Sequence, residues 1–394
     1  MTNDTAISAS SRAPLAGVRV LDLTRLLPGP VCTLHLADLG ADVIKIEDTG
    51  AGDYAAPALR ALVQRNKRAL RLDLKQPEGV QALKALVRTA DVLVEGFRPG
   101  VMERLGVGYA ALAAINPRLV YCSITGYGQN GPLRDAPGHD LNYCALAGVS
   151  EQIGQGGEPA LSNLPVADLM GGALTSAMGL LAALFDAGRT GRGRHVDIAM
   201  ADAALAHNVV AMATLNAHGS TRQAGADKLS GALPCYGLYK TRDGRHLAVG
   251  ALERKFWEGF CDTLGRPDLR AQHLPASAVQ AAAVRADLAE LIGAQTLAHW
   301  QEVFAGNDCC VTPVLRLDEA LQDPQFRARG MALAAQEVPG ATGAQLASPV
   351  QMSGHVFAVH RPAPRPGEHS DEVRTEAGYT AAQCAALRAQ GVVA

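Results

Sequence analysis

The chain has 394 residues, of which 48% are hydrophobic and only 19% are charged. This is enough apolar material for a large core and more length than one average domain needs, so we expect two domains or one domain with a large insertion. The 36 basic and 38 acidic residues nearly cancel. No run of lysine and arginine could follow a phosphate backbone, which argues against nucleic acid as a partner.

The N-terminal stretch "MTNDTAISASSRAPLAG" has no apolar signal core, and no later segment offers about 18 uninterrupted apolar residues. We therefore expect a cytoplasmic protein with no membrane partner. The eight cysteines include no C-x-x-C pair, and the eleven histidines include no H-E-x-x-H motif. These patterns predict reduced thiols and no metal site.

Predicted strands alternate with predicted helices through the first third of the chain. The strands are expected at 17–24, 41–47, 68–74, 91–97 and 119–128, and the helices at 30–40, which closes on Gly40, and 77–90. This alternation predicts an α/β fold with a mostly parallel sheet covered on both faces.

A nicotinamide enzyme is one interpretation of this half, because Glu47 lies where a ribose-binding acid would stand. The turn after the first strand argues against it. It reads "RLLPGP" instead of G-x-G-x-x-G, and Pro28 and Pro30 remove two backbone donors from the loop.

A second region begins near residue 226. Two strand-like runs are joined through Arg242-Asp243-Gly244, a sequence suited to a hairpin turn. Later elements are predicted as helices at 253–264, 277–293 and 296–305, short strands after residue 330, and a final helix at 380–389.

The segment 169–185 is nearly all small or apolar and predicts a helix buried on every side, with Gly188 as its stop. Asp168 stands at its start. It could be a simple N-cap. Alternatively, the helix N-terminus lowers the pKa of this carboxyl group, and free amides beside Gly171 and Gly172 hold a developing oxyanion.

His139 lies in "DAPGHDLNYCAL", behind a Pro-Gly turn. It could be a buried structural histidine or a turn residue, or it could be a base aimed at a substrate. The adjacent Asp140 does not make a pair with it, because neighbouring side chains along a chain seldom face each other. The residues alone leave both interpretations open.

Several longer motifs occur in order along the chain: "PLAGVRVLDLTRLLPGPVCTLHLADLGADVIKIE", "DVLVEGFRPGVMERLG", "CSITGYGQNGP", "GHDLNY", the Asp168 segment, "GALERKFW" and "RPGEHSDEV". Over residues 14–392 the chain resembles the family III CoA-transferases and is most similar in motif to their α-methylacyl-CoA racemase branch.

The resemblance implies a large Rossmann-like CoA-binding domain at 1–205 and 330–394, a linker at 206–225 and a smaller α+β domain at 226–329. It also implies an interlocked homodimer whose active sites lie between the large domain of one chain and the small domain of the other. The substrate would be an acyl-CoA thioester, with no cofactor beyond the CoA moiety.

The two branches of the family would use Asp168 differently. In the transferases the matching aspartate is a nucleophile that forms an aspartyl-CoA thioester. In the racemases it is an acid/base that acts with a histidine matching His139, which a glutamate matching Glu253 orients. A histidine at 139, where transferases commonly have an aromatic residue, favours a racemase that exchanges the α-proton of a 2-methyl-branched acyl-CoA through an enolate. A CoA-transferase is the alternative, and a CoA-binding protein with an inactive site is a third.

One departure from the racemase pattern concerns the residue four places before Asp168. The racemases have an asparagine there, whereas this chain has Leu164, preceded by Asn163. For CoA, the resemblance points to Arg98 as a phosphate contact and to Arg65, Lys67 and Arg68 as its neighbours, although all four could be solvated surface cations. Glu253 could equally be an ordinary acid at a helix N-terminus.

Overall fold

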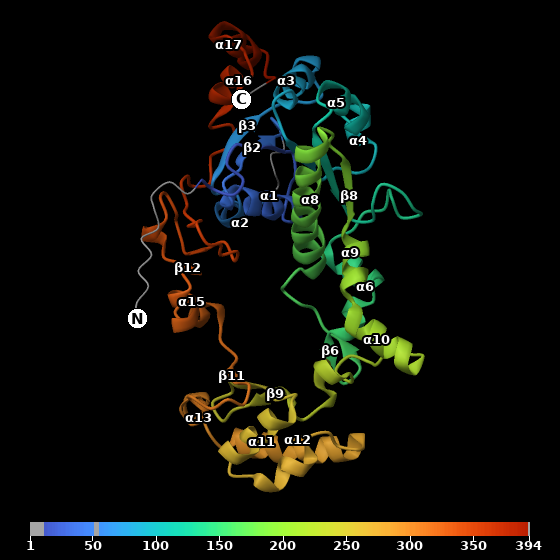
Figure 1. Cartoon of the computed structure of the whole chain (residues 1–394), viewed down its shortest axis with the longest axis vertical. Coiled ribbons are helices and arrows are strands. Elements are labelled where there is room, and N and C mark those ends of the chain that lie inside the picture. Colours follow the sequence, from blue (N-terminus) through green and yellow to red (C-terminus); the bar gives the residue numbers. More distant parts are fainter. Residues whose placement is uncertain (1–11, 51–54, 393–394) are drawn as a thin grey trace. The chain divides into compact units, whose positions relative to one another are not determined.

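The structure is a computed structural model that describes residues 12–50 and 55–392. These residues form two compact units (Figure 1). The large unit contains the chain up to Ala147, Leu164–His207 and the chain from Pro324 onward, and the small unit contains Gly148–Asn163 and Asn208–Asp323.

The boundary between the units differs from the predicted linker at 206–225. That segment contains a helix, α10 (Val209–His218), and from Asn208 onward it groups with the small unit. Its sequence, "VVAMATLNAH", is mostly apolar and rich in helix-forming residues, so it is not a flexible connection.

The large unit is built on a six-stranded sheet in which every neighbouring pair of strands is parallel. Its order is β3-β2-β1-β4-β5-β8. The strands are β1 (Arg19–Asp22), β2 (Asp42–Glu47), β3 (Lys67–Arg71), β4 (Val92–Glu95), β5 (Val120–Thr125) and β8 (His195–Ala199). The predicted parallel sheet is confirmed. Its order changes direction between β1 and β4, and ligands bind beyond the carboxyl ends of the strands at such a point.

Helices complete the large unit. They are α1 (Pro28–Asp38), α2 (Pro57–Val63), α3 (Pro77–Val87), α4 (Val101–Arg104), α5 (Tyr109–Ile115), α6 (Asp140–Leu146), the π-helix η1 (Ala167–Leu174), α8 (Thr175–Thr190), α9 (Met200–His207), α15 (Pro324–Ala328), the 3₁₀ turn η4 (Ala335–Glu337), α16 (Ser370–Glu376) and α17 (Ala381–Ala389). A small ribbon of β12 (Ala332–Leu333) and β13 (Gln345–Leu346) lies in the C-terminal part.

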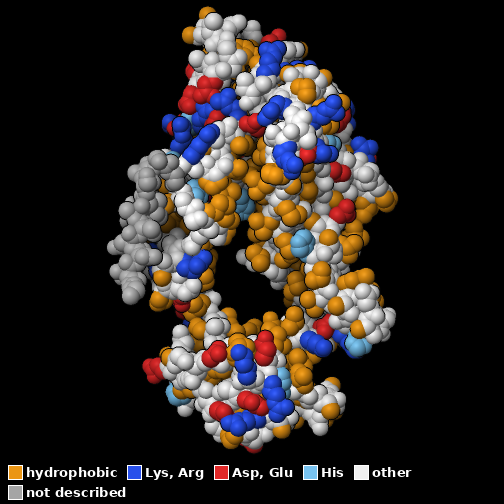
Figure 2. All heavy atoms as spheres, viewed as in Figure 1, with side chains coloured by type: hydrophobic (Ala, Val, Ile, Leu, Met, Phe, Trp, Pro, Cys, Tyr) orange, Lys and Arg blue, Asp and Glu red, His pale blue; other side chains and the backbone are white. Residues whose placement is uncertain are grey.

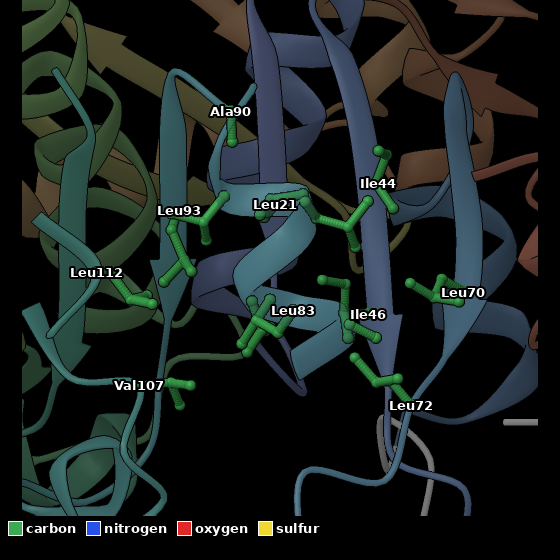
Figure 3. Packing of buried hydrophobic residues seen from close by; sticks show 14 of the residues in the cluster. Leu21, Ile44, Ile46, Leu70, Leu72, Leu83, Ala90, Leu93, Val107 and Leu112 are labelled. Atoms are coloured by element: carbon green, nitrogen blue, oxygen red, sulfur yellow. The ribbon is translucent and has the colours of Figure 1, made fainter. Parts of the chain in front are cut away.

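The sheet has helices on both faces. α1 and α8 contact each other and the strands on one face. On the other face Leu83 of α3 and Leu112 of α5 join Leu21, Ile44 and Leu93 of the strands in one core, seen from close by in Figure 3. Because helices cover both faces of this parallel sheet, most side chains on both sides of its strands are apolar.

The C-terminal segment belongs to the same core. Val373 of α16 and Leu387 of α17 are buried in the cluster that contains the strand residues. The imidazole of His369 accepts the backbone N–H of Ala69 through Nδ1 at 3.2 Å. The end of the chain therefore packs on β3, at one edge of the sheet (Figure 1).

The connection between β1 and α1 is tight. α1 begins at Pro28, two residues before the predicted start, because proline is well tolerated in a first helical turn. It is followed by Gly40, whose φ of +96° favours glycine. A Cβ at Gly29 would lie 2.2 Å from the Cβ of Thr24, so this glycine allows the loop to fold back on itself.

The long apolar helix differs from its prediction. It consists of η1 and α8 in succession and ends at Gly191, in the left-handed region at φ +72°, instead of at Gly188. One side is buried, but Met178 is 65% and Phe185 is 68% exposed. Apolar side chains gather over α8 in Figure 2. The prediction of burial on every side is therefore wrong. By length and composition alone, Ala167–Thr190 could cross a membrane, and 33% of its most apolar window is buried inside the protein.

The small unit has its own core. Its sheet, β11-β10-β9, contains the predicted hairpin, with Gly244 at φ +75° in the turn. Trp257, Phe260, Leu288 and Trp300 are buried behind it. The elements are α7 (Val149–Gln152), β6 (Gly154–Gln155), β7 (Glu158–Pro159), α10, the π-turn η2 (Lys228–Ala232), β9 (Tyr236–Lys240), β10 (His246–Gly250), α11 (Arg254–Thr263), the 3₁₀ turn η3 (Pro267–Gln272), α12 (Ala278–Gly293), α13 (Leu297–Phe304), β11 (Val311–Pro313) and α14 (Leu317–Ala320).

Candidate active site

A pocket of about 730 Å³ opens in the large unit at the carboxyl ends of β1, β4 and β5. Its walls come from the loops after these three strands and from the turn before α6. The lining segments are Thr24–Leu26 with Pro28 and Gly29, Gly96–Pro99, Ile124–Tyr127, and Ala136–His139, together with Arg134, Asn142, Tyr143, Asp168 and Met200. This is the position at which α/β sheets of this order bind small ligands.

Asp168 lines this pocket from the first turn of η1. The helix starts at Ala167 after Val166, and the Asp168 side chain makes no capping hydrogen bond, so the interpretation as an N-cap is wrong. The backbone N–H of Asp168 donates to Oδ1 of Asp140 at 2.9 Å. A π-helical turn is rare and often marks a functional position.

The pKa of Asp168 is raised to about 6, mainly because burial penalises the carboxylate and next because Asp140 is negative, while the charge of His139 opposes both. The expectation that this pKa is lowered is therefore wrong, because burial and the negative charge of Asp140 raise it. A carboxyl group with a pKa near the working pH is suited to both giving and taking a proton.

His139 lines the same pocket and is exposed, which excludes a buried structural histidine. It immediately precedes α6, and its backbone N–H donates to Oδ1 of Asn142 at 3.0 Å. Asp168 lines this pocket as well. The two residues that the sequence singled out therefore share one cavity.

Tyr143 holds the turn that carries His139. Its hydroxyl donates to the carbonyl of Gly138 at 2.5 Å, and its ring fills the space beside Gly126 and Gly138, where a Cβ would lie within 2.6 Å of it. Burial, assisted by the negative charge of Asp168, raises the pKa of Tyr143 to about 12, so its hydroxyl stays a donor. Sequence reasoning quoted this tyrosine in "GHDLNY" without assigning it a role.

Asp140 is the second residue whose role the sequence did not reveal. Although Asp140 is next to His139 in the sequence, its carboxylate contacts other residues. It instead receives the Asp168 N–H, and the Cys144 thiol lies 3.7 Å from its Oδ2. The hydrogen bond that fixes the start of η1 thus comes from Asp140, whereas Leu164 is 62% exposed.

The amides beside Gly171 and Gly172 are not part of the cavity. Both glycines are buried and do not line the pocket. A Cβ on Gly172 would lie 2.6 Å from the Cβ of Pro28, so this glycine allows η1 to pack closely on the start of α1. The expectation that these amides hold an oxyanion is corrected accordingly.

Arg98 lines the pocket and is exposed, as a ligand-contacting cation should be. Arg25 and Arg134, which the sequence did not single out, line it too. The signal that could have found them is their place in the loops that follow β1 and β5, at the carboxyl edge of the sheet.

Arg65, Lys67 and Arg68 lie outside the pocket lining. Arg65 forms an ion pair with Asp38 at 2.6 Å, and Arg68 forms one with Asp42 at 2.6 Å. All three are buried, so their charges are used within the fold. The expectation that they contact CoA is therefore corrected. The basic run "RNKR" leads into the buried strand β3 and does not form an exposed loop.

Lys67 belongs to a fully buried charge network beneath the pocket. Its Nζ lies 3.2 Å from Oδ2 of Asp22 and donates to the carbonyl of Pro30 at 2.8 Å. Lys45 reaches Oδ1 of the same aspartate at 3.4 Å. Burial, against the attraction of Asp22, lowers the pKa of Lys67 to about 8. Asp22 also accepts the backbone N–H of Thr24 at 2.9 Å. The network therefore forms hydrogen bonds to both ends of the pocket loop, at Thr24 and at Pro30.

Glu253 belongs to the small unit and is exposed at the N-cap position of α11. Its backbone carbonyl accepts the N–H groups of Phe256 and Trp257 at 3.0 and 3.1 Å, and its carboxylate makes no capping hydrogen bond. It therefore occupies the ordinary position of an acid at a helix start. Its part in catalysis stays a prediction.

A second cavity of about 400 Å³ lies in the large unit beside the ends of β1, β2 and β3. Its walls are mainly apolar, including Leu72 and Leu74. The charged members are Arg25, Glu47, Asp48 and Lys75. Arg25 and Phe97 line both cavities. Within residues 12–50 and 55–392, no three His, Cys, Asp or Glu side chains are grouped so that they could hold a metal ion.

Comparisons with known proteins agree with this architecture. The sequence profile named CoA-transferase family III matches residues 15–370. A human α-methylacyl-CoA racemase is 35% identical over 382 residues, covering 96% of this chain and 97% of the relative. A succinate–glutarate CoA-transferase from Agrobacterium fabrum is 32% identical over 390 residues, covering 93% and 96%. The crystal structure of a CaiB/BaiF family protein from Brucella suis superposes with a TM-score of 0.81 at 29% identity, covering 93% and 99%.

Proposed function

Because this chain belongs to CoA-transferase family III, an enzyme family that contains both racemases and CoA-transferases, we propose that it is an acyl-CoA racemase. Its reaction is the exchange of the α-proton of a 2-methyl-branched acyl-CoA. The observation that carries the proposal is the presence of His139 and Asp168 in one pocket, with the pKa of Asp168 near 6.

The chemistry needs two groups that can each take or give a proton. The thioester carbonyl acidifies the neighbouring C–H bond, and a base removes that proton as the electron pair moves into an enolate. Reprotonation from the opposite face by a second group inverts the centre. His139 and Asp168 serve as these two groups, and the direction of the reaction decides which one begins as the base.

The surrounding residues support this use of the pair. Asp140 fixes the backbone of Asp168, and Tyr143 fixes the carbonyl that precedes His139. Both reacting side chains are thus set on restrained backbone while their functional groups face the cavity. Such restraint lowers the cost of reaching the reactive geometry.

CoA is the expected carrier of the acyl group, and no further cofactor is needed. We place its thioester at His139 and Asp168, with Arg98 as a phosphate contact, because a guanidinium group suits phosphate oxygens. The second cavity takes the nucleotide end. Its apolar walls suit a base, and Lys75 lies there for an anionic group.

We further propose a cytoplasmic homodimer in which Glu253 of one subunit orients His139 of the other. Exposed apolar side chains on α8, α9 and α10, among them Met178, Phe185, Leu205 and Met212, support a protein interface on the surface of this chain. Light scattering during gel filtration should give twice the mass of the chain, and a monomer at micromolar concentration would overturn this part of the proposal.

The test of the activity starts from one epimer of a 2-methyl-branched acyl-CoA. Chiral separation of the hydrolysed acid should show conversion towards a mixture of both epimers. His139→Ala and Asp168→Ala should each abolish conversion. Retention of a single epimer by wild-type protein, with several branched substrates, would contradict the racemase assignment.

A CoA-transferase is the second candidate, because a succinate–glutarate CoA-transferase is almost as similar as the racemase. Asp168 would then attack the thioester and carry CoA as an aspartyl thioester. Borohydride should inactivate such an enzyme only after acyl-CoA is added, and the modified residue should be Asp168. His139→Ala would retain much of this chemistry, which distinguishes the two activities.

A further inference from the structure

Arg25 stands where the two cavities of the large unit adjoin. Among residues 12–50 and 55–392, Arg25 and Phe97 line both the pocket with His139 and Asp168 and the cavity beside the ends of β1, β2 and β3. The centre of its guanidinium group lies 5.2 Å from the centre of the Phe97 ring. The junction is thus formed by one cation stacked on one aromatic ring.

The backbone that carries Arg25 is held firmly. Asp22 accepts the backbone N–H of Thr24 at 2.9 Å and its hydroxyl at 2.6 Å, and Lys67 binds the carbonyl of Pro30 at 2.8 Å. Leu26, the next residue, has φ +64°, a conformation that costs a non-glycine residue about 1 kcal/mol or more. A buried network thus fixes a strained loop beside the cavities.

The Arg25 side chain forms an ion pair with Asp48. Its Nη2 atom lies 3.9 Å from Oδ2 of Asp48, which is longer than a hydrogen bond. The two side chains are 30% and 24% exposed. The pair is therefore partly open to solvent, from which an anionic ligand can reach it.

We propose that Arg25, the ion-pair partner of Asp48, binds the diphosphate of the acyl-CoA at this junction. The inference rests on the proposed function, which places the thioester at one end of a ligand and the nucleotide at the other. A diphosphate joins these two ends in CoA, so a ligand filling both cavities brings it past Arg25. A planar guanidinium group stacked on Phe97 presents its N–H donors to phosphate oxygens.

Asp48 gives the proposal a distinctive signature. A carboxylate close to the junction repels a diphosphate and competes with it for Arg25. Removing the charge with Asp48→Asn should therefore tighten CoA binding, whereas removing the cation with Arg25→Met should weaken it. A pair with a merely structural role would lose affinity in both variants.

The experiment measures CoA binding to the full-length protein by titration calorimetry. Arg25→Met should bind CoA about 10- to 100-fold more weakly, as expected for loss of a hydrogen bond to a charged group, while Arg25→Lys should recover part of the loss. Arg194→Met is the matched control. It removes a surface arginine, paired with Asp186 at 2.7 Å, that lies outside both cavities, and should leave binding unchanged.

A truncated ligand separates the proposed contact from a general disturbance of the pocket. An acyl-pantetheine thioester has the reacting end of acyl-CoA but no phosphate, so its KM should be the same in wild type and Arg25→Met. An equal loss for both ligands would overturn the proposal. So would CoA affinity of Arg25→Met equal to that of wild type, or weaker binding by Asp48→Asn.

Failure of this inference can be told apart from failure of the proposed function. If wild-type protein does not bind CoA, the proposed function itself is wrong, and the inference falls with it. If wild type binds CoA and Arg25→Met binds it equally well, only the role of Arg25 is wrong. Circular dichroism and thermal unfolding of each variant ensure that the compared proteins are folded.

Discussion

Asp140→Asn tests how the negative charge beside Asp168 sets the acid/base pair. The carboxylate of Asp140 accepts the Asp168 N–H at 2.9 Å and is the second cause, after burial, of the rise in the pKa of Asp168 from 3.8 to about 6. Asparagine keeps an oxygen acceptor at that position and removes the charge. The pKa of Asp168 should therefore fall, but only part of the way, because burial is unchanged.

The measurement is the pH profile of kcat/KM for α-proton exchange. The substrate is the epimer whose α-proton Asp168 removes. Asp168 acts as a base only when ionised, so the acidic limb of the profile for this epimer reports its pKa in the free enzyme. In Asp140→Asn this limb should move down by about 0.5 to 1 pH unit. Asp140→Ala, which loses the hydrogen bond as well, should also lower the rate on the plateau. An acidic limb that stays in place in Asp140→Asn would refute the electrostatic argument.

Three further predictions concern single residues. Asp168→Asn should raise the free energy of unfolding by about 1 to 2 kcal/mol more at pH 8 than at pH 4, measured by urea denaturation. Folding raises the pKa of this carboxyl group from 3.8 to about 6, so its ionised form destabilises the fold increasingly as the pH rises through this range. No difference between the two pH values would contradict this. Tyr143→Phe should lower kcat about tenfold with little change in melting temperature, since it removes the hydrogen bond to Gly138 that holds the turn before His139; unchanged kcat would argue against that role. Lys67→Met should destabilise the protein by about 3 to 5 kcal/mol in the same urea assay, because it leaves Asp22 buried with one cation fewer, and a loss below about 1 kcal/mol would show that the network is not tightly coupled.

Much of the fold could be predicted because its signals are local. The alternation of β-branched runs with amphipathic helices identified the parallel sheet, and Asp243-Gly244 identified the hairpin of the small unit. The long helix from Ala167 was predicted less well. Its apolar composition suggested burial on every side, yet Met178 and Phe185 are exposed. Apolar composition alone does not tell which face of a helix packs on the core and which face points outward.

The site was predicted in part. His139 and Asp168 were singled out by their motifs, and the structure places both in one pocket. The pKa of Asp168 was expected to fall, because a helix start can be read from a sequence, whereas the extent of burial that outweighs it cannot.

The supporting residues were harder to find. Asp140 contacts Asp168 across 28 positions of sequence, a pairing that spacing does not reveal. Arg65, Lys67 and Arg68 looked like a ligand-binding run, but their strand is buried and each finds an acidic partner from another part of the chain. Charge alone does not tell whether a cation serves a ligand or the fold.

The central claim is that His139 and Asp168 move a proton at the α-carbon of an acyl-CoA. The most direct measurement is incubation with a 2-methyl-branched acyl-CoA in heavy water, followed by mass spectrometry of the acyl group. Wild-type protein should introduce one deuterium at the α-position, and substitution of either His139 or Asp168 by alanine should abolish net inversion. Absence of deuterium from several branched substrates, with CoA binding intact, would contradict the account.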